Sequence, residues 1–93
     1  MEKYVNKMSI KEQIKEIILM FDSNSYIGIK NANINELFLL VKKFGKEKVF
    51  RFIKEIGEED TRFKESILIL KNEIESLLKE DVENSFISNF YKN

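Results

Sequence analysis

Apolar side chains recur at the spacing of an α-helix along almost the whole of this 93-residue chain, and no proline interrupts them. The clearest stretch holds Ile10, Ile14, Ile17, Ile18 and Phe21, which stand at i, i+4, i+7, i+8 and i+11. That spacing places all of them on one face of an amphipathic helix. The same period continues towards the C-terminus, so we predict that the protein is all-α.

Capping signals and glycines indicate where these helices begin and end. Ser9 and Glu12 form an S-x-x-E capping box, and Asn33 and Glu36 form a second one of the N-x-x-E type. Gly45 and Gly57 are the expected C-terminal stops, because glycine adopts positive φ without a steric penalty. The predicted helices cover residues 10–22, 34–44, 46–56 and 61–80.

The remaining segments are less regular. The segment that follows the first helix is expected to form a loop to about Asn33, held in place by Tyr26, Ile27 and Ile29. A break near Glu80 and Asp81 would leave 82–91 as a short fifth helix; the alternative is that the last helix continues to the C-terminus. Short connections between helices favour an up-and-down arrangement. We therefore predict one domain over 1–93, a small antiparallel bundle of four helices, or five if the break occurs.

The composition excludes most catalytic chemistry. The chain contains no Cys and no His, which rules out disulfides, thiol nucleophiles, Ser-His-Asp catalysis and zinc sites built from these residues. Its three glycines are too far apart to form a phosphate-binding loop. Carboxylate pairs remain for acid–base work, but no such pair is placed in an evident apolar pocket. We expect neither an enzyme, nor a cofactor, nor a metal site.

Some apolar side chains lie outside the stripe that each helix is expected to bury. At 100° per residue, Leu19 and Leu39 point away from the core faces of their helices, and Leu68 and Ile69 flank the stripe of the last helix on both sides. A helix that is apolar all round is normally buried on all sides. Two interpretations follow: the last helix is central and surrounded by the others, or these four residues form a partner-binding or dimer interface.

Charge is balanced over the whole chain, with sixteen basic and sixteen acidic residues, but it is segregated locally. A basic face is expected over 42–54, and it could bind phosphate groups without reading bases because it lacks Asn and Gln. It comprises Lys42, Lys43, Lys46, Lys48, Arg51 and Lys54. An acidic patch is expected from the residues that follow, and an inhibitor of a nucleic-acid machine would use such acids to mimic phosphate. It comprises Glu58, Glu59, Asp60, Glu73, Glu80 and Asp81.

These patterns favour a non-enzymatic helical protein-interaction module that inhibits or regulates a larger bacterial complex. Abundant Lys, Ile and Asn indicate an A/T-rich genome, bacterial or phage. An anti-defence (anti-CRISPR-like) protein of a phage or mobile element, or an immunity protein, are examples of such a role. The alternatives are a small nucleic-acid-binding protein using 42–54 and a structural subunit of a larger assembly.

The expected partner is thus a protein, with nucleic acid as the second candidate and a homodimer as a further option. The longest uninterrupted apolar run is Ile17 to Phe21, far shorter than the roughly 20 residues of a membrane span or the core of a signal peptide. We therefore expect no membrane partner and a cytoplasmic location.

Overall fold

The computed structural model describes the backbone of residues 8–92 and the side chains of residues 8–81. Four helices pack against one another, and residues 8–92 contain no β-strand. They are α2 (Ile10–Ser23), α3 (Ile27–Phe44), α4 (Lys46–Glu59) and α5 (Lys64–Lys92), with a 3₁₀ turn, η1 (Thr61–Phe63), before α5. The predicted all-α helical bundle is confirmed.

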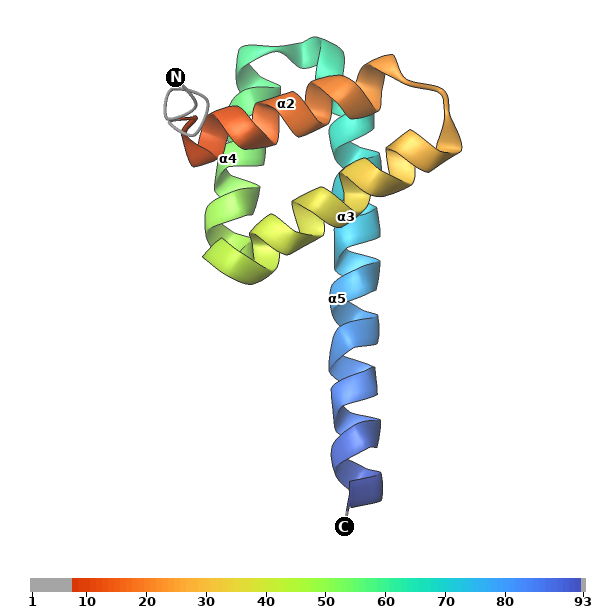
Figure 1. Cartoon of the computed structure of the whole chain (residues 1–93). Helices are drawn as coiled ribbons and strands as arrows, with labels where there is room; N and C mark the ends of the chain where they lie inside the picture. The colour runs from red at the N-terminus through yellow and green to blue at the C-terminus, as the bar shows by residue number, and fades with distance from the viewer. Residues whose placement is uncertain (1–7, 93) are drawn as a thin grey trace, which may run out of the picture.

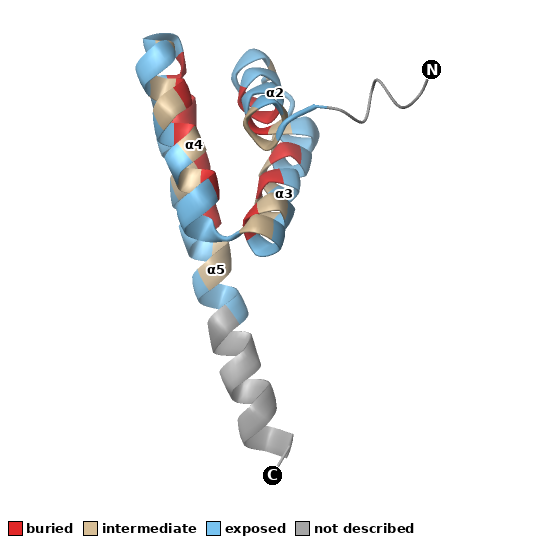
Figure 2. Ribbon diagram, turned by 90° about the vertical axis from the view of Figure 1, so that its left-hand side faces the viewer, coloured by how far each residue is buried: buried red, intermediate tan, exposed pale blue. Residues whose placement is uncertain are grey.

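The helices form two layers of two. Figure 1 shows α4 and α5 running roughly alongside each other in opposite directions, with α2 and α3 crossing them. In the turned view of Figure 2, α2 and α3 lie together on one side and α4 and α5 on the other. The C-terminal part of α5 extends beyond the other three helices (Figure 1).

The core lies between these layers. In Figure 2 the buried residues of α4 face those of α2 and α3. α2 contributes the apolar stripe that its periodicity predicts, and each of the other elements adds one face of its own. The core residues are Ile14, Ile17, Ile18, Phe21, Leu37, Val41, Val49, Ile53, Ile56, Phe63, Ile67, Leu70 and Ile74.

The start of α2 agrees with its sequence signals. The Ser9 hydroxyl accepts from the Glu12 N–H at 3.1 Å, and the Glu12 carboxylate accepts from the Ser9 N–H at 3.0 Å. Both bonds of the capping box are therefore present and satisfy two backbone donors that a helix start otherwise leaves free.

The predicted start of the next helix at residue 34 is wrong, because α3 begins at Ile27. Asn33 is not a cap: it is 2% exposed and lies in the middle of the helix. The extra turns are held by Lys30, whose ammonium donates to the Phe21 carbonyl at 2.7 Å and lies 4.0 Å from the centre of the Phe21 ring. This contact places a positive charge at the C-terminal end of α2, where the helix dipole favours it. Tyr26 and Ile27 are 71% and 76% exposed, so they do not hold a loop.

Two other predicted boundaries are also wrong. α4 continues through Gly57 to Glu59, and a Cβ on Gly57 would come within 3.2 Å of the Ile67 Cδ1 atom. Glycine here permits close packing of α4 against α5 and does not stop the helix. The predicted break near Glu80 is absent, since the α5 backbone is helical from Lys64 to Lys92.

Asn33 leads to a prediction about stability. Its amide nitrogen is buried and has no hydrogen-bond partner among the described residues. Leucine has the same branched shape and no polar atom to satisfy, so Asn33→Leu is expected to raise the free energy of unfolding by about 1–2 kcal/mol. Chemical denaturation measures the change, with Asn35→Leu at an exposed position of α3 as the control. A loss of stability in Asn33→Leu alone would show that the buried amide is satisfied.

Candidate partner-binding groove

An apolar groove of about 380 Å³ lies between α2 and α3. Its volume is in the range of about 300–1,000 Å³ that is typical of binding pockets. Aliphatic side chains and methionines dominate its walls, and two glutamates stand among them. The lining residues are Met8, Gln13, Glu16, Ile17, Met20, Glu36, Leu39 and Leu40.

Helical periodicity places these residues along the two banks. On α2 the lining residues stand at i, i+3, i+4 and i+7 from Gln13 to Met20, which is one face of a helix. On α3 the lining residues Glu36, Leu39 and Leu40 stand at i, i+3 and i+4. Ile17 is 5% exposed and belongs to the core, whereas Met20 is 46% and Leu39 is 64% exposed. Met8, which also lines the groove, is 43% exposed, so the groove joins the core to three apolar side chains that are open to solvent.

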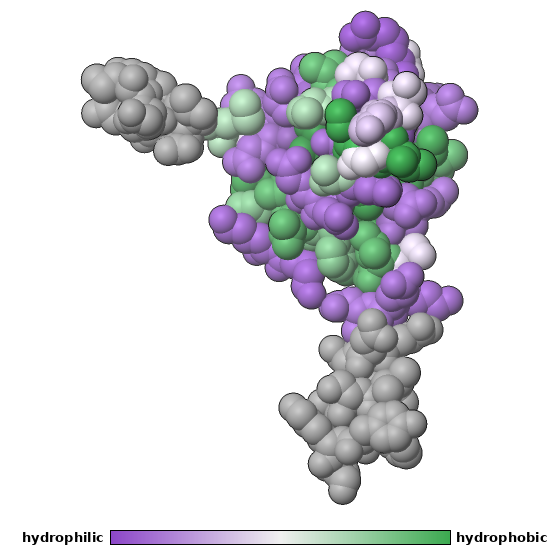
Figure 3. All heavy atoms as spheres, turned by 45° about the vertical axis from the view of Figure 1, so that its right-hand side comes forward, coloured by the Kyte–Doolittle hydropathy of each residue, from purple (hydrophilic) through white to green (hydrophobic). Residues whose placement is uncertain are grey.

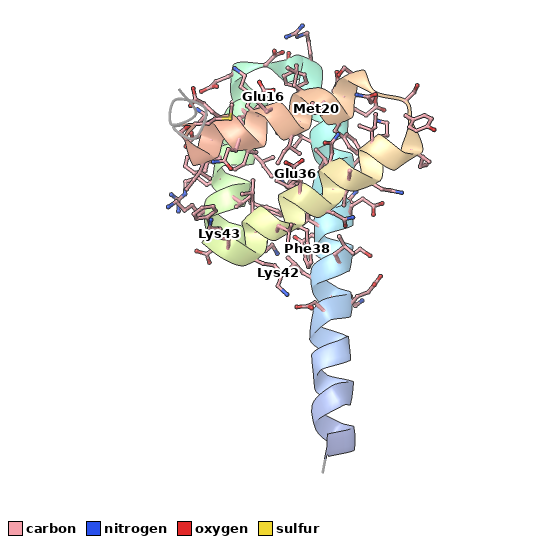
Figure 4. The ribbon with its side chains drawn as sticks, in the orientation of Figure 1. Glu16, Met20, Glu36, Phe38, Lys42 and Lys43 are labelled. Atoms are coloured by element: carbon pink, nitrogen blue, oxygen red, sulfur yellow. The ribbon has the colours of Figure 1, made fainter. Side chains whose placement is uncertain are left out.

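Both glutamates of the groove are exposed. Glu16 and Met20 lie on α2 and Glu36 lies on α3, whereas Phe38, Lys42 and Lys43 lie further towards the end of α3 that leads to α4 (Figure 4). No lysine or arginine among residues 8–81 forms an ion pair with Glu16 or Glu36. The groove thus combines an apolar surface with two negative charges that the described part of the chain does not pair.

The predicted basic face is only partly brought together. Lys42 and Lys46 pair with acids of α5, Asp81 at 3.0 Å and Glu75 at 2.9 Å. Lys43 and Lys48 both lie over the Phe44 ring, at 5.3 and 5.9 Å from its centre. Such contacts anchor side chains at the corner between α3 and α4. At 100° per residue, Arg51 and Lys54 share the outer face of α4 with Glu47 and Glu58, so this face is not uniformly positive.

The six predicted acids do not form one patch. Glu58, Glu59 and Asp60 lie at the end of α4, whereas Glu80 and Asp81 lie some sixteen residues into α5. At about 1.5 Å per residue, this places the two groups more than about 20 Å apart along α5. Glu73 lies between them on the same helix.

Three of these acids also have partners within the chain. Glu59 receives a hydrogen bond from the Lys11 ammonium at 2.7 Å, and Lys11 lowers the pKa of Glu59 below its usual value. Asp60 receives several hydrogen bonds from Arg62, which lower the pKa of this carboxyl to about 2. Asp81 pairs with Lys42. The Lys11–Glu59 pair joins the start of α2 to the end of α4, the Asp60–Arg62 pair closes the turn before α5, and the Lys42–Asp81 pair joins α3 to α5, so each has a structural role.

The four apolar residues singled out from the helical angles are all exposed: Leu19 43%, Leu39 64%, Leu68 60% and Ile69 45%. The interpretation of the last helix as surrounded by the others is therefore wrong for Leu68 and Ile69. The four residues do not line a single groove, because Leu39 alone among them lines the groove between α2 and α3. Figure 3 shows exposed hydrophobic side chains in several separate places among hydrophilic ones.

Among the residues that line this groove, the predicted apolar interface includes Leu39 but not Met20, Glu16 or Glu36. The predicted capping box places Glu36 in the first turn of a helix that starts after Asn33. In the structure Glu36 instead lies on an exposed face in the middle of α3. A signal was available in the five consecutive apolar residues from Ile17 to Phe21, because such a run covers more of the helix circumference than the stripe of Ile17, Ile18 and Phe21 that α2 buries.

Other kinds of site find little support in the described residues. No three Asp or Glu side chains among them converge in a way that could hold a metal ion. None of the helices has the length and apolar character needed to cross a membrane within the described part of the chain. Comparison with protein families, curated proteins and solved structures finds no match to this chain.

Proposed function

We propose that this protein is a non-enzymatic interaction module that regulates a larger complex by binding one of its proteins in the groove between α2 and α3. The observation that supports the proposal is the apolar opening of that groove, where Met20 and Leu39 are exposed beside the buried Ile17. Apolar surface that is removed from water on binding contributes about 25 cal/mol per Å². A concave, mostly apolar surface with a few polar groups is also the usual form of a binding site.

The charged surfaces support a binding function less well. Two of the six basic residues pair with α5, and two others lie over Phe44. A protein that binds DNA gains most of its affinity from Lys and Arg that are available to neutralise phosphates. The groove itself has two glutamates in its lining, which would repel a nucleic-acid backbone.

The composition of the chain favours regulation by binding over covalent modification of a partner. A protein of 93 residues without histidine or cysteine has few means of altering a partner covalently. It can instead occupy a surface that the partner uses for something else. We propose that the chain inhibits its complex in this way, by covering a segment of one subunit.

Paired capture tests the proposed function. The tagged chain is expressed in its source cell, and the captured protein is quantified for the wild type, Leu39→Glu and Leu68→Glu. Both substitutions place a charge at an exposed leucine, so both variants are expected to fold. We expect Leu39→Glu to reduce the captured partner at least tenfold, because a charge is buried against apolar atoms, and Leu68→Glu to leave it within about twofold of the wild type.

Circular dichroism and denaturant unfolding are the controls for the folding of both variants, and both are expected to unfold cooperatively. A partner retained by Leu39→Glu, or lost equally by both variants, would contradict the proposal. The proposal would also be contradicted if the wild-type chain captured no protein at a constant molar ratio to itself.

A further inference from the structure

We infer that the occupant of this groove is an amphipathic α-helix of the partner, with apolar residues at i and i+4 and lysine or arginine beside them. The inference rests on the proposed function and names the chemistry of the segment that is bound. It draws on the shape of the groove, the residues that line it and its two glutamates, which no base among residues 8–81 pairs.

The length of the groove suits a short helical segment. On α2 its lining runs from Gln13 to Met20, which at about 1.5 Å per residue is about 10 Å, or two turns of a partner helix. Over two turns a helix presents residues i and i+4 on one face. We therefore expect the exposed Met20 and Leu39, one on each bank of the groove, to contact two such anchors.

The described part of the chain lacks the features that two other modes of peptide recognition require. Addition of a strand needs a free sheet edge, and residues 8–92 contain no strand. Recognition of a polyproline helix needs a groove lined by aromatic rings, whereas the residues lining this groove include none. A groove built from Met, Ile and Leu is typical of helix recognition, and the flexible methionines can adapt to the anchors.

Charge complementarity identifies the residues next to the anchors. Glu16 lies on one bank and Glu36 on the other, and neither pairs with a base among residues 8–81. A long basic side chain can lay its aliphatic part along the apolar groove and bring its charge to a carboxylate. Basic residues on either side of the anchors would therefore pair with both banks, which favours the correct partner over an acidic helix.

Two synthetic helical peptides test the inference by fluorescence anisotropy. Both have leucine at i and i+4; one has lysine at the neighbouring positions and the other has glutamate. For the wild-type protein at about 50 mM salt, we expect the lysine peptide to bind about tenfold more tightly, because two exposed ion pairs replace two repulsions. The variant with both Glu16→Lys and Glu36→Lys is expected to prefer the glutamate peptide.

The matched control carries Glu58→Lys and Glu73→Lys, which change the net charge equally but at exposed acids outside the groove. It is expected to keep the preference of the wild type. Equal binding of the two peptides to the wild-type protein would overturn the inference. It would also be overturned if the control variant came to prefer the glutamate peptide as strongly as the groove variant does. A wild-type dimer that Leu39→Glu dissociates would assign the groove to a second copy and would also overturn it.

The two experiments separate the inference from the proposed function. Capture that depends on Leu39, together with peptides that bind equally, would leave the groove as the binding site and reject the basic helix as its occupant. Loss of the Leu39 dependence in capture would reject the proposed function itself, whatever the peptides show.

Discussion

Replacing Leu70 by alanine is expected to lower the free energy of unfolding by about 2–5 kcal/mol. Leu70 is 0% exposed and lies on the face of α5 that packs against the other helices. Alanine would remove its contacts and leave a cavity that rigid neighbours only partly fill. A chain of this length has a total stability of about 5–14 kcal/mol, so the loss would be a large part of it. Denaturant unfolding followed by circular dichroism measures the change.

Leu68→Ala is the control for this prediction. The two leucines are separated by one residue on the same helix, but Leu68 is 60% exposed. Its truncation is expected to change the stability by no more than about 0.5 kcal/mol. Similar losses in both variants would show that α5 is enclosed on all sides and would contradict the two-layer arrangement.

Gly45→Ala is expected to destabilise the protein by about 1–3 kcal/mol. Gly45 alone connects α3 to α4, and its backbone has φ 96° and ψ 144°. Residues with a side chain rarely adopt this conformation, because their Cβ approaches the neighbouring backbone. No atom beyond the adjacent residues lies within 4 Å of a Cβ added here, so the expected loss arises from the backbone alone. Thermal and denaturant unfolding measure it.

Gly28→Ala provides the opposite expectation. Gly28 lies in the first turn of α3, and an added Cβ would meet the Tyr26 ring at an ordinary distance of 3.7 Å. Alanine restricts the unfolded chain more than glycine does, so this variant is expected to gain about 0.4–1 kcal/mol. If both glycine variants gained stability, the result would contradict the positive φ of Gly45 between α3 and α4.

The helices that could be predicted are those whose periodicity and caps agree. Ile10–Ser23 has an apolar stripe and a capping box, and both are present in the structure. The start of α3 could not be predicted, because the preference of Asn33 for a cap is outweighed by packing of α3 against α2 and by the contact of Lys30 with Phe21. The predicted helix end at Gly57 is wrong for a related reason: the absence of a side chain at Gly57 allows close packing against Ile67, and the helix continues through it.

The candidate site was less predictable than the fold. Helical angles alone identify Leu39 as a residue outside the core stripe, because that is a local property. The groove forms only where α2 and α3 pack side by side, and the periodicity of each helix does not predict that tertiary arrangement. The charged faces illustrate the same limit: Lys42 and Asp81 are 39 residues apart in the chain, and their ion pair removes one charge from each predicted surface.

Photo-crosslinking tests most directly the claim that a partner protein occupies the groove between α2 and α3. A photoreactive phenylalanine analogue is placed singly at Leu39, Met20, Arg51 or Leu68, all of which are exposed, and the cells are irradiated. We predict crosslinks to one and the same protein from Leu39 and Met20, and none from Arg51 or Leu68. Crosslinks from Arg51 or Leu68 without any from the groove positions would contradict the claim.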